Sequence, residues 1–308
     1  MSAEDQLNQY AAEQDTVLTI GTFDGVHIGH QAILGQLRVE CELTGLMPTV
    51  VTFRNHPRSV LTPGENTDQI ISLDDRLLLL KKNGVRHIVV LDFTLEFSKL
   101  RAREFIVYLI RHLRMRSLVI GPDFTLGFKR EGNVTKLEEL SKELGFSLRI
   151  VDSRILGELS VRSRILRQMI LTGDVKTARD MMGRPFVLKG MVGVGDRRGR
   201  ELGFPTANLQ PEQGLVIPGN GIYAARTKIS GKLLPTVVSV GVRPTFGGGY
   251  RTIEAYIMNF DENIYDVWIE LEFVDFIREE IKFDSVEGLI KQMHHDVQSS
   301  RLILGGNK

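Results

Sequence analysis

The stretch TVLTIGTFDGVHIGHQAILGQLRVECEL (residues 16–43) decides the fold of the first half of the chain. Its first part, residues 16–23, is rich in β-branched and apolar residues and predicts a strand. From residue 31 to 43 the apolar residues recur at helical spacing. Glycines in the joining turn let the backbone bend sharply and approach a ligand closely: Gly21, Gly25 and Gly29. The stretch therefore predicts a strand, a glycine-rich turn and a helix.

The same alternation continues along the first half of the chain. Further strands are predicted at residues 48–53, 87–93, 117–121 and 146–151, and further helices at 73–84, 102–113 and 136–145. Alternation of this kind indicates an α/β domain with a mostly parallel sheet covered by helices. Ligands of such sheets bind beyond the carboxyl ends of the strands.

The second half has a different pattern, which predicts a small antiparallel β-barrel. A hairpin is expected around Gly231, and a second is expected to join residues 251–258 to the run that begins at Ile264. Trp268 alternates with apolar neighbours and is assigned to the core. The terminal helix carries an apolar stripe: Val286, Leu289, Ile290, Met293 and Val297. The predicted domains are residues 1–182 and 183–308.

Composition excludes several classes of protein. The chain has 39 Lys and Arg against 38 Asp and Glu, and a net charge of +1 provides no field for nucleic acid or an anionic membrane. Cys41 is the only cysteine, which excludes an intramolecular disulfide and a cysteine metal cage. The polar first fifteen residues do not resemble a signal peptide. We therefore expect a cytoplasmic protein with no nucleic-acid or membrane partner.

The turn GTFDGVHIGHQ (residues 21–31) predicts a nucleotide site. His27 and His30 are three residues apart at a helix start, so they share a face. The free N–H groups of a helix start attract an anion, and imidazole donors can stabilise charge developing on a phosphoryl group. Two alternatives are a glycine-rich surface turn and a pair of metal ligands, although no third ligand follows at a recognisable spacing.

This string resembles the N-terminal signature of bacterial bifunctional riboflavin kinase/FAD synthetases. The resemblance continues through TFRNHP (52–57), VLDFTLEFSKLRAREFI (90–106) and GPDFTLGFKREGN (121–133). It implies a Rossmann-like domain similar to the HxGH nucleotidyltransferases, which would transfer an adenylyl group from ATP to FMN and release FAD and pyrophosphate. By this resemblance His27 and His30 contact the ATP phosphates. Residues implied to line the nucleotide site are Gly21, Phe23, Asp24 and Gly25, and those implied to line the flavin or nucleotide cleft are Asn55, His56, Pro57, Asp123 and Phe124.

One motif departs from the family pattern. The family has a phosphate-binding S-S-T-x-I-R sequence, and the equivalent here is RSRILR (162–167). Ser163 and Arg167 match, whereas Arg162 and Arg164 replace two hydroxyl residues. Guanidinium groups suit oxyanions, so the phosphate contacts can be retained. The alternatives are that both arginines are surface charges, or that the first domain is degenerate and the chain is only a kinase.

A second motif, GMVGVGDRRGRELGFPTANL (190–209), predicts a second nucleotide site. A glycine-rich loop with basic residues can wrap phosphates with its N–H groups. The residues assigned to this role are Gly190, Gly195, Arg198 and Pro205. Thr206 and Asn208 are two residues apart, so on an extended segment their side chains share one face. They offer the oxygen ligands that Mg²⁺ prefers. The alternative is a glycine-rich hairpin, but the string resembles the riboflavin kinase signature.

Glu254 is the candidate general base of this second domain. It lies in the predicted strand RTIEAYIM, with Ile253 and Ala255 on the opposite face. A carboxylate near a primary alcohol can accept its proton during phosphoryl transfer. The resemblance implies that the alcohol is the riboflavin 5′-hydroxyl, so that riboflavin, ATP and Mg²⁺ yield FMN and then FAD. An exposed strand glutamate, or a flavin-binding regulator without activity, is the alternative.

Overall fold

A computed structural model describes the chain except for residues 63–67, 152–160, 196–197, 244–249 and 306–308. The described residues form two compact units, Met1–Arg162 and Ser163–Lys308. The division at 162 differs from the expected one at 182, because α7 (Ser163–Leu171) and α8 (Val175–Met182) pack with the second unit.

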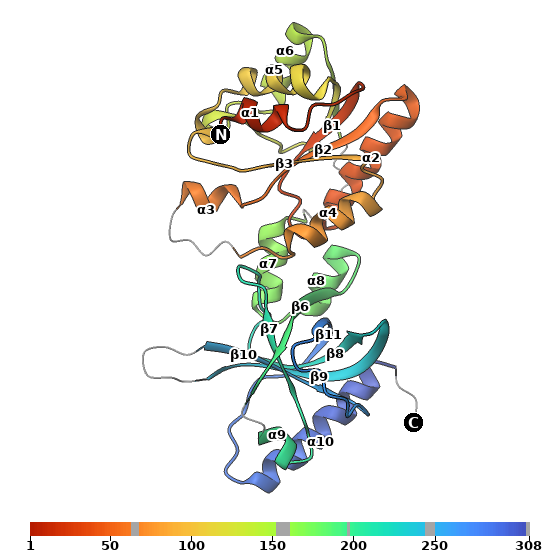
Figure 1. Ribbon diagram of the computed structural model, residues 1–308, viewed down its shortest axis with the longest axis vertical. Coiled ribbons are helices and arrows are strands. Elements are labelled where there is room, and N and C mark those ends of the chain that lie inside the picture. Colours follow the sequence, from red (N-terminus) through yellow and green to blue (C-terminus); the bar gives the residue numbers. More distant parts are fainter. Residues whose placement is uncertain (63–67, 152–160, 196–197, 244–249, 306–308) are drawn as a thin grey trace. The chain divides into compact units, whose positions relative to one another are not determined.

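The first unit contains a five-stranded parallel sheet, as the sequence predicts. Its strands are β1 (Thr16–Ile20), β2 (Met47–Phe53), β3 (His87–Leu91), β4 (Met115–Ile120) and β5 (Ser147–Ile150). The strand order is β3-β2-β1-β4-β5, and all neighbours are parallel. The chain therefore proceeds to one side of β1 first, through β2 and β3 (Figure 1), and then returns to its other side at β4. Ligands of open parallel sheets bind at such a change of direction, beyond the carboxyl ends of the strands.

Helices connect these strands. They are α1 (Ala3–Asn8), α2 (Ile28–Thr44), α3 (Pro57–Leu61), α4 (Leu73–Lys82), α5 (Ala102–Leu113) and α6 (Val134–Leu144). Their ends follow from local sequence. The Ser72 side chain caps the start of α4, and Gly45 ends α2 in the left-handed region at φ 72°. Every residue of β1 is buried, so the sheet is covered on both faces.

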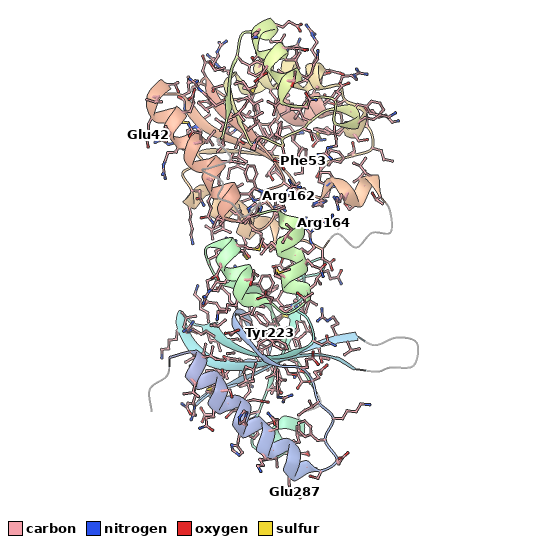
Figure 2. All side chains as sticks on the ribbon, turned by 180° about the vertical axis from the view of Figure 1, so that it is seen from behind. Glu42, Phe53, Arg162, Arg164, Tyr223 and Glu287 are labelled. Carbon is pink, nitrogen blue, oxygen red and sulfur yellow. The ribbon has the colours of Figure 1, made fainter. Side chains whose placement is uncertain are left out.

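The second unit is a closed antiparallel barrel, which confirms the predicted fold class. Its strands are β6 (Phe186–Gly193), β7 (Ala207–Pro211), β8 (Gly221–Ile229), β9 (Lys232–Arg243), β10 (Tyr250–Ile257) and β11 (Trp268–Arg278). They close in the order β10-β7-β6-β11-β8-β9. Tyr223 on β8, labelled in Figure 2, is buried. Its ring packs edge-on against Phe273 and Phe276 of β11. The short helix α9 (Arg198–Glu201) and the terminal helix α10 (Val286–Ile303) complete the unit.

One of the two expected hairpins is correct and the other is wrong. β8 and β9 form the hairpin at Ser230 and Gly231, whose φ values of 48° and 80° suit the twist of a two-residue turn. β10 and β11 do not pair with each other. β10 lies between β9 and β7, and β11 lies between β6 and β8. Barrel closure occupies both edges of each strand, so sequence neighbours separated by a long connection need not be partners.

One burial expectation is also wrong. Trp268 is 57% exposed, because Ile269, Leu271 and Phe273 occupy the buried face of β11 and side chains alternate along a strand. The apolar stripe of α10 is not buried against the barrel: Val286 is 55% exposed, while the buried residues of the helix are Asp296 and Ser300. Leu289, Met293 and Val297 of the stripe line a cavity described below.

Candidate active sites

The turn after β1 has an unusual backbone. Phe23, Gly25 and Val26 all have positive φ values, of 49°, 84° and 37°. This region is unfavourable for residues with a side chain, and such conformations persist where the surroundings hold them, often at functional sites. Gly21 allows the turn to close, because a Cβ there would lie 3.1 Å from the Phe23 ring.

His27 and His30 form a stacked pair at the start of α2. The two ring centroids are 3.7 Å apart with planes inclined by 17°. His27 is the N-cap of the helix, and its Nδ1 atom accepts a hydrogen bond of 3.3 Å from the His30 backbone N–H. Acceptance at Nδ1 places the proton of neutral His27 on Nε2. A neutral His27 would therefore donate through its Nε2–H group.

His30 is held in the neutral state. Burial lowers its pKa well below 6.5, and the nearby His27 and Arg76 lower it further. Its Nδ1 atom is buried and has no hydrogen-bond partner among the described residues. A buried polar atom without a partner is costly, and such atoms occur at sites where a ligand supplies the missing bond. The pair therefore fits a role as hydrogen-bond donors to an anion, with His30 neutral.

Asp24 and Gly25, assigned to the nucleotide site by sequence, are buried within the turn. Asp24 is 1% exposed, and its carboxylate accepts a hydrogen bond of 2.8 Å from the Ile70 backbone N–H. This bond fixes the segment before α4 against the turn. The structure thus shows Asp24 as a support of the turn.

The residues assigned to the cleft follow the carboxyl ends of β2 and β4. The Asn55 side chain bonds both backbone groups of Phe93, at 2.8 and 2.9 Å, and so joins the chain after β2 to the chain after β3. His56 caps α3, and Pro57 occupies its first turn. Beyond β4, the Asp123 carboxylate lies 3.3 Å from the Arg162 guanidinium, while Phe124 packs against the hydrophobic core.

Ser163 and Arg167 belong to α7, in the second unit. Figure 2 labels their neighbours Arg162 and Arg164, which are both exposed at this junction of the two units along the chain. The first unit thus holds the two histidines, while the matching residues of the RSRILR motif begin the second unit.

The barrel brings the kinase candidates together on neighbouring strands. Glu254 of β10 lies opposite Asn208 of β7 in the antiparallel register. The Thr206 hydroxyl donates a hydrogen bond of 3.4 Å to Glu254 Oε2. Gly195 allows this arrangement, because a Cβ at its position would overlap the Asn208 side-chain amide. Two residues of the glycine-rich segment, Thr206 and Asn208, therefore lie beside Glu254, which is distant from them in sequence.

Three further assignments concern the glycine-rich segment. A Cβ at Gly190 would overlap the Gln210 carbonyl, so this glycine serves the close pairing of β6 and β7. Pro205 is exposed and lines a cavity. The backbone of Arg198 begins α9, but its side chain lies outside the described part of the chain, as do residues 196 and 197.

Two cavities adjoin the Thr206–Glu254 pair. The first, of about 330 Å³, lies between the barrel wall and α10 and is lined by apolar and aromatic side chains together with the charged residues Glu254, Arg278, Glu280 and Asp296. Its largest apolar walls are Leu202, Phe204, Tyr256, Phe283, Leu289 and Met293. The second, of about 250 Å³, is lined by Pro205, Ala255 and the segment 260–265. Thr206 lines both cavities. The neighbouring strand β10 presents Glu254 to one cavity and Ala255 to the other, because side chains alternate along a strand.

The Thr206 hydroxyl, the Asn208 amide and the Glu254 carboxylate fit a magnesium ion by their chemistry. Mg²⁺ takes oxygen ligands, keeps several waters and is usually held by few protein groups together with substrate phosphates. No group of three or more His, Cys, Asp or Glu residues that could hold a metal occurs in the described ranges.

Comparison with known proteins identifies both units. The FAD synthetase family model matches residues 9–165, and the riboflavin kinase family model matches residues 182–304. The bifunctional riboflavin kinase/FMN adenylyltransferase of Haemophilus influenzae is 35% identical, covering 94% of each chain, and that of Listeria monocytogenes is 35% identical, covering 92% of this chain and 91% of the relative. The chain belongs to the bifunctional riboflavin kinase/FMN adenylyltransferase family.

This family was the one indicated by the two sequence motifs, and the expectation is confirmed. A Streptococcus pneumoniae crystal structure named macrolide-efflux protein has the same fold, with a TM-score of 0.89, 30% identity and 96% coverage of both chains. Among the helices of the described residues, none has the length and apolar character needed to cross a membrane. The kinase family model begins at residue 182, so the family models and the two compact units place α7 and α8 differently.

Sequence reasoning missed Arg76 of α4. Its side chain is 2% exposed, and it lies one turn before the buried Leu80 on the inner face of the helix. The sequence LDDRLLLLKK could have indicated that Arg76 is buried. Arg76 lies four positions before Leu80, so both residues are on the helix face that packs toward the sheet.

Proposed function

We propose that the second unit transfers the γ-phosphoryl group of ATP to the 5′-hydroxyl of riboflavin, and that the first unit transfers the adenylyl group of a second ATP to the FMN so formed. The observation that carries the kinase assignment is the position of Thr206, which lines both cavities and donates to Glu254. A group that joins two cavities is suited to the point where phosphate and acceptor meet.

We place the flavin in the 330 Å³ cavity beneath α10. An isoalloxazine ring is a flat aromatic body, and the aromatic and aliphatic walls of this cavity match it. The carboxylate of Glu254 lies in the same cavity, where it can accept the proton of the 5′-hydroxyl. The hydroxyl oxygen bonds the γ-phosphorus, the bond from that phosphorus to the β–γ bridging oxygen breaks, and ADP leaves.

The nucleotide then occupies the 250 Å³ cavity on the other side of Thr206. Its walls include Asn263 and Tyr265, which offer polar contacts beside the apolar Val192 and Ile264. Thr206 and Asn208 would hold Mg²⁺, which would neutralise charge on the phosphates. Close approach of the backbone at Gly195 keeps Asn208 in place for this task.

Adenylyl transfer uses the histidine pair of the first unit. An FMN phosphate oxygen is already ionised, so it attacks the α-phosphorus of ATP without a general base. The new phosphorus–oxygen bond forms as the bond to pyrophosphate breaks, and charge accumulates on the oxygens around the α-phosphorus. The N–H groups of His27 and of the neutral His30 would donate hydrogen bonds to that charge.

We further propose a cytoplasmic location. Both reactions consume ATP, and the single cysteine forms no disulfide that would indicate an oxidising compartment. Riboflavin, FMN and ATP are the proposed partners, and the near-zero net charge does not favour nucleic acid.

The direct test is incubation of the pure chain with riboflavin, ATP and MgCl₂, with FMN and FAD separated over time. We expect FMN to appear first and FAD to follow, and chelation of the metal to suppress FMN formation. FMN without FAD would leave the chain as a kinase only. Absence of both products under conditions that maintain the fold would contradict the proposal.

A further inference from the structure

The buried guanidinium of Arg76 lies beneath the histidine turn of the first unit. Its Nη1 atom donates to the Thr22 carbonyl at 3.0 Å and to the Phe53 carbonyl at 2.7 Å. Its Nη2 atom donates to Gln69 Oε1 at 2.7 Å. Thr22 follows β1, Phe53 ends β2, and Gln69 belongs to the segment before α4. One side chain thus ties together three segments at the carboxyl edge of the sheet (Figure 2 labels Phe53).

This arrangement is expensive for stability alone. Arg76 is 2% exposed, burial lowers its pKa, and its Nε atom has no hydrogen-bond partner among the described residues. Removing a charge from water costs several kcal/mol, and apolar side chains of similar volume are often as stable or more stable in such places. A buried, incompletely bonded cation at the edge where ligands bind therefore suggests a role beyond packing.

Arg76 is connected to the His27–His30 pair through the backbone of Thr22 and the ring of Phe23. The Thr22 carbonyl accepts from Arg76 and also from the Thr52 hydroxyl at 3.1 Å. The next residue, Phe23, has a φ of 49°, and its ring lies against His30 with centroids 5.0 Å apart. Fixing the Thr22 carbonyl therefore fixes the surface on which the His30 ring rests.

We propose that Arg76 is a positioning residue of the adenylyltransferase site, because its planar guanidinium fixes the turn that carries Phe23 and thereby the stacked rings of His27 and His30. A planar fork with fixed donors suits this task, since a lysine ammonium offers a single point of charge. The proposal rests on the assignment of the histidine pair to adenylyl transfer.

The positive charge of Arg76 also affects the histidine pair, because it lowers the pKa of His30. Burial is the largest cause of the low pKa of His30, followed by His27 from the turn and Arg76 from α4. Asp24, also in the turn, interacts with Arg76 and raises the pKa of the guanidinium. A neutral side chain at position 76 would remove one repulsion and allow His30 to take up a proton at a higher pH.

The test compares three full-length variants: Arg76→Met, Arg76→Lys and the control Lys81→Met, which removes an exposed cation from the same helix. We expect both Arg76 variants to lower kcat for FAD formation from FMN by about tenfold or more, since small misplacements of catalytic groups have such effects. FMN formation by the second unit, measured on the same samples, should be unchanged. Lys81→Met should behave as the natural protein in both assays.

A second measurement separates positioning from a merely structural role. The imidazole of His30, followed by NMR across a pH titration, should titrate at a higher pH in Arg76→Met and close to its natural value in Arg76→Lys. Because the lysine variant keeps the charge, it carries the test if the methionine variant does not fold.

Three results would overturn the proposal: natural FAD formation in both Arg76 variants, equal loss of both activities, or an unchanged titration of His30 in Arg76→Met. The parent assignment is tested separately by His27→Ala. Natural FAD formation in that variant would remove the histidine pair from the mechanism. An inactive His27→Ala beside fully active Arg76 variants would remove only the positioning role.

Discussion

At the scale of single residues, the histidine pair has the geometry of a donor site for an anion. His27 caps α2 and stacks on His30 at 3.7 Å, and the buried Nδ1 atom of His30 has no partner in the described part of the chain. The attacking FMN phosphate is already an anion, so the reaction does not need either ring as a nucleophile. Their contribution is therefore expected in the transition state.

Replacement of either histidine should slow adenylyl transfer specifically. We expect His27→Ala and His30→Ala each to lower kcat/KM for FAD formation. The activation free energy should rise by about 2.7 kcal/mol or more, the effect of losing one donor to a developing charge. Steady-state rates with FMN and ATP measure the loss, and riboflavin phosphorylation on the same sample is the control. Turnover equal to that of the natural protein would exclude the replaced histidine from the mechanism.

The neutral state of His30 also predicts a pH dependence of stability. Because burial holds the pKa of His30 well below 6.5, the unfolded chain binds a proton where the folded chain does not. The contribution of His30 to stability is therefore complete above about pH 6.5 and decreases as the pH falls below that value. Thermal unfolding at about pH 7.5 and 5.5 should show a larger loss in the natural protein than in His30→Gln.

His87 supplies the internal control for that experiment. Its pKa is also lowered by burial, and it is present in both proteins, so its effect cancels in the comparison. An equal loss of melting temperature in the natural protein and in His30→Gln would show that His30 is not held neutral.

At the scale of elements, glycines decide how closely β6 and β7 approach at the kinase site. Gly195→Ala should raise KM for Mg-ATP by about tenfold, or about 1.4 kcal/mol, because its Cβ would displace the Asn208 amide. The control is Gly35→Ala in α2, where a Cβ meets nothing within 4 Å. That change should leave both activities intact and stabilise the helix by about 0.5–1 kcal/mol. A natural KM in Gly195→Ala would contradict the role given to Asn208.

The junction before α7 tests the departure from the family motif. Replacing Arg162 and Arg164 together by Ala should lower FAD formation by about tenfold, because charge-assisted contacts to phosphate are lost. Arg162→Ser with Arg164→Thr, which restores the family's hydroxyls, should recover the rate. The exposed Arg162–Asp123 pair contributes about 1 kcal/mol at most, so the fold should survive either change. Full activity of the alanine variant would identify both arginines as surface charges.

At the scale of the whole molecule, two units with separate sites predict two separable activities. Glu254→Gln should lower riboflavin phosphorylation by about 10²- to 10⁴-fold, the usual contribution of a general base, and leave FAD formation from supplied FMN unchanged. A mixture of Glu254→Gln and His27→Ala should convert riboflavin to FAD, since FMN released by one protein is adenylylated by the other. Loss of both activities in Glu254→Gln would show that the sites are not separate.

The fold was predictable where it depends on local sequence. The parallel sheet and the turn at Ser230 and Gly231 follow from patterns of a few residues, such as alternation and positive φ. The exposure of Trp268 could also have been predicted, because Ile269, Leu271 and Phe273 alternate on the inner face of β11 and leave Trp268 on the outer face. The pairing of β10 with β7 was not, since it joins residues about fifty positions apart and depends on closure of the barrel.

The sequence by itself determined the chemistry this protein has available: two histidines at a helix start, a Thr–x–Asn pair after a glycine-rich loop, and a glutamate in a strand. Only the tertiary structure decided what those groups face. It placed Thr206 between two cavities, set Leu289, Met293 and Val297 of α10 along one of them, and buried Arg76 under the histidine turn. The reason is physical: residue types and spacing fix charge and local geometry, whereas burial, desolvation and the approach of distant strands arise when the chain packs.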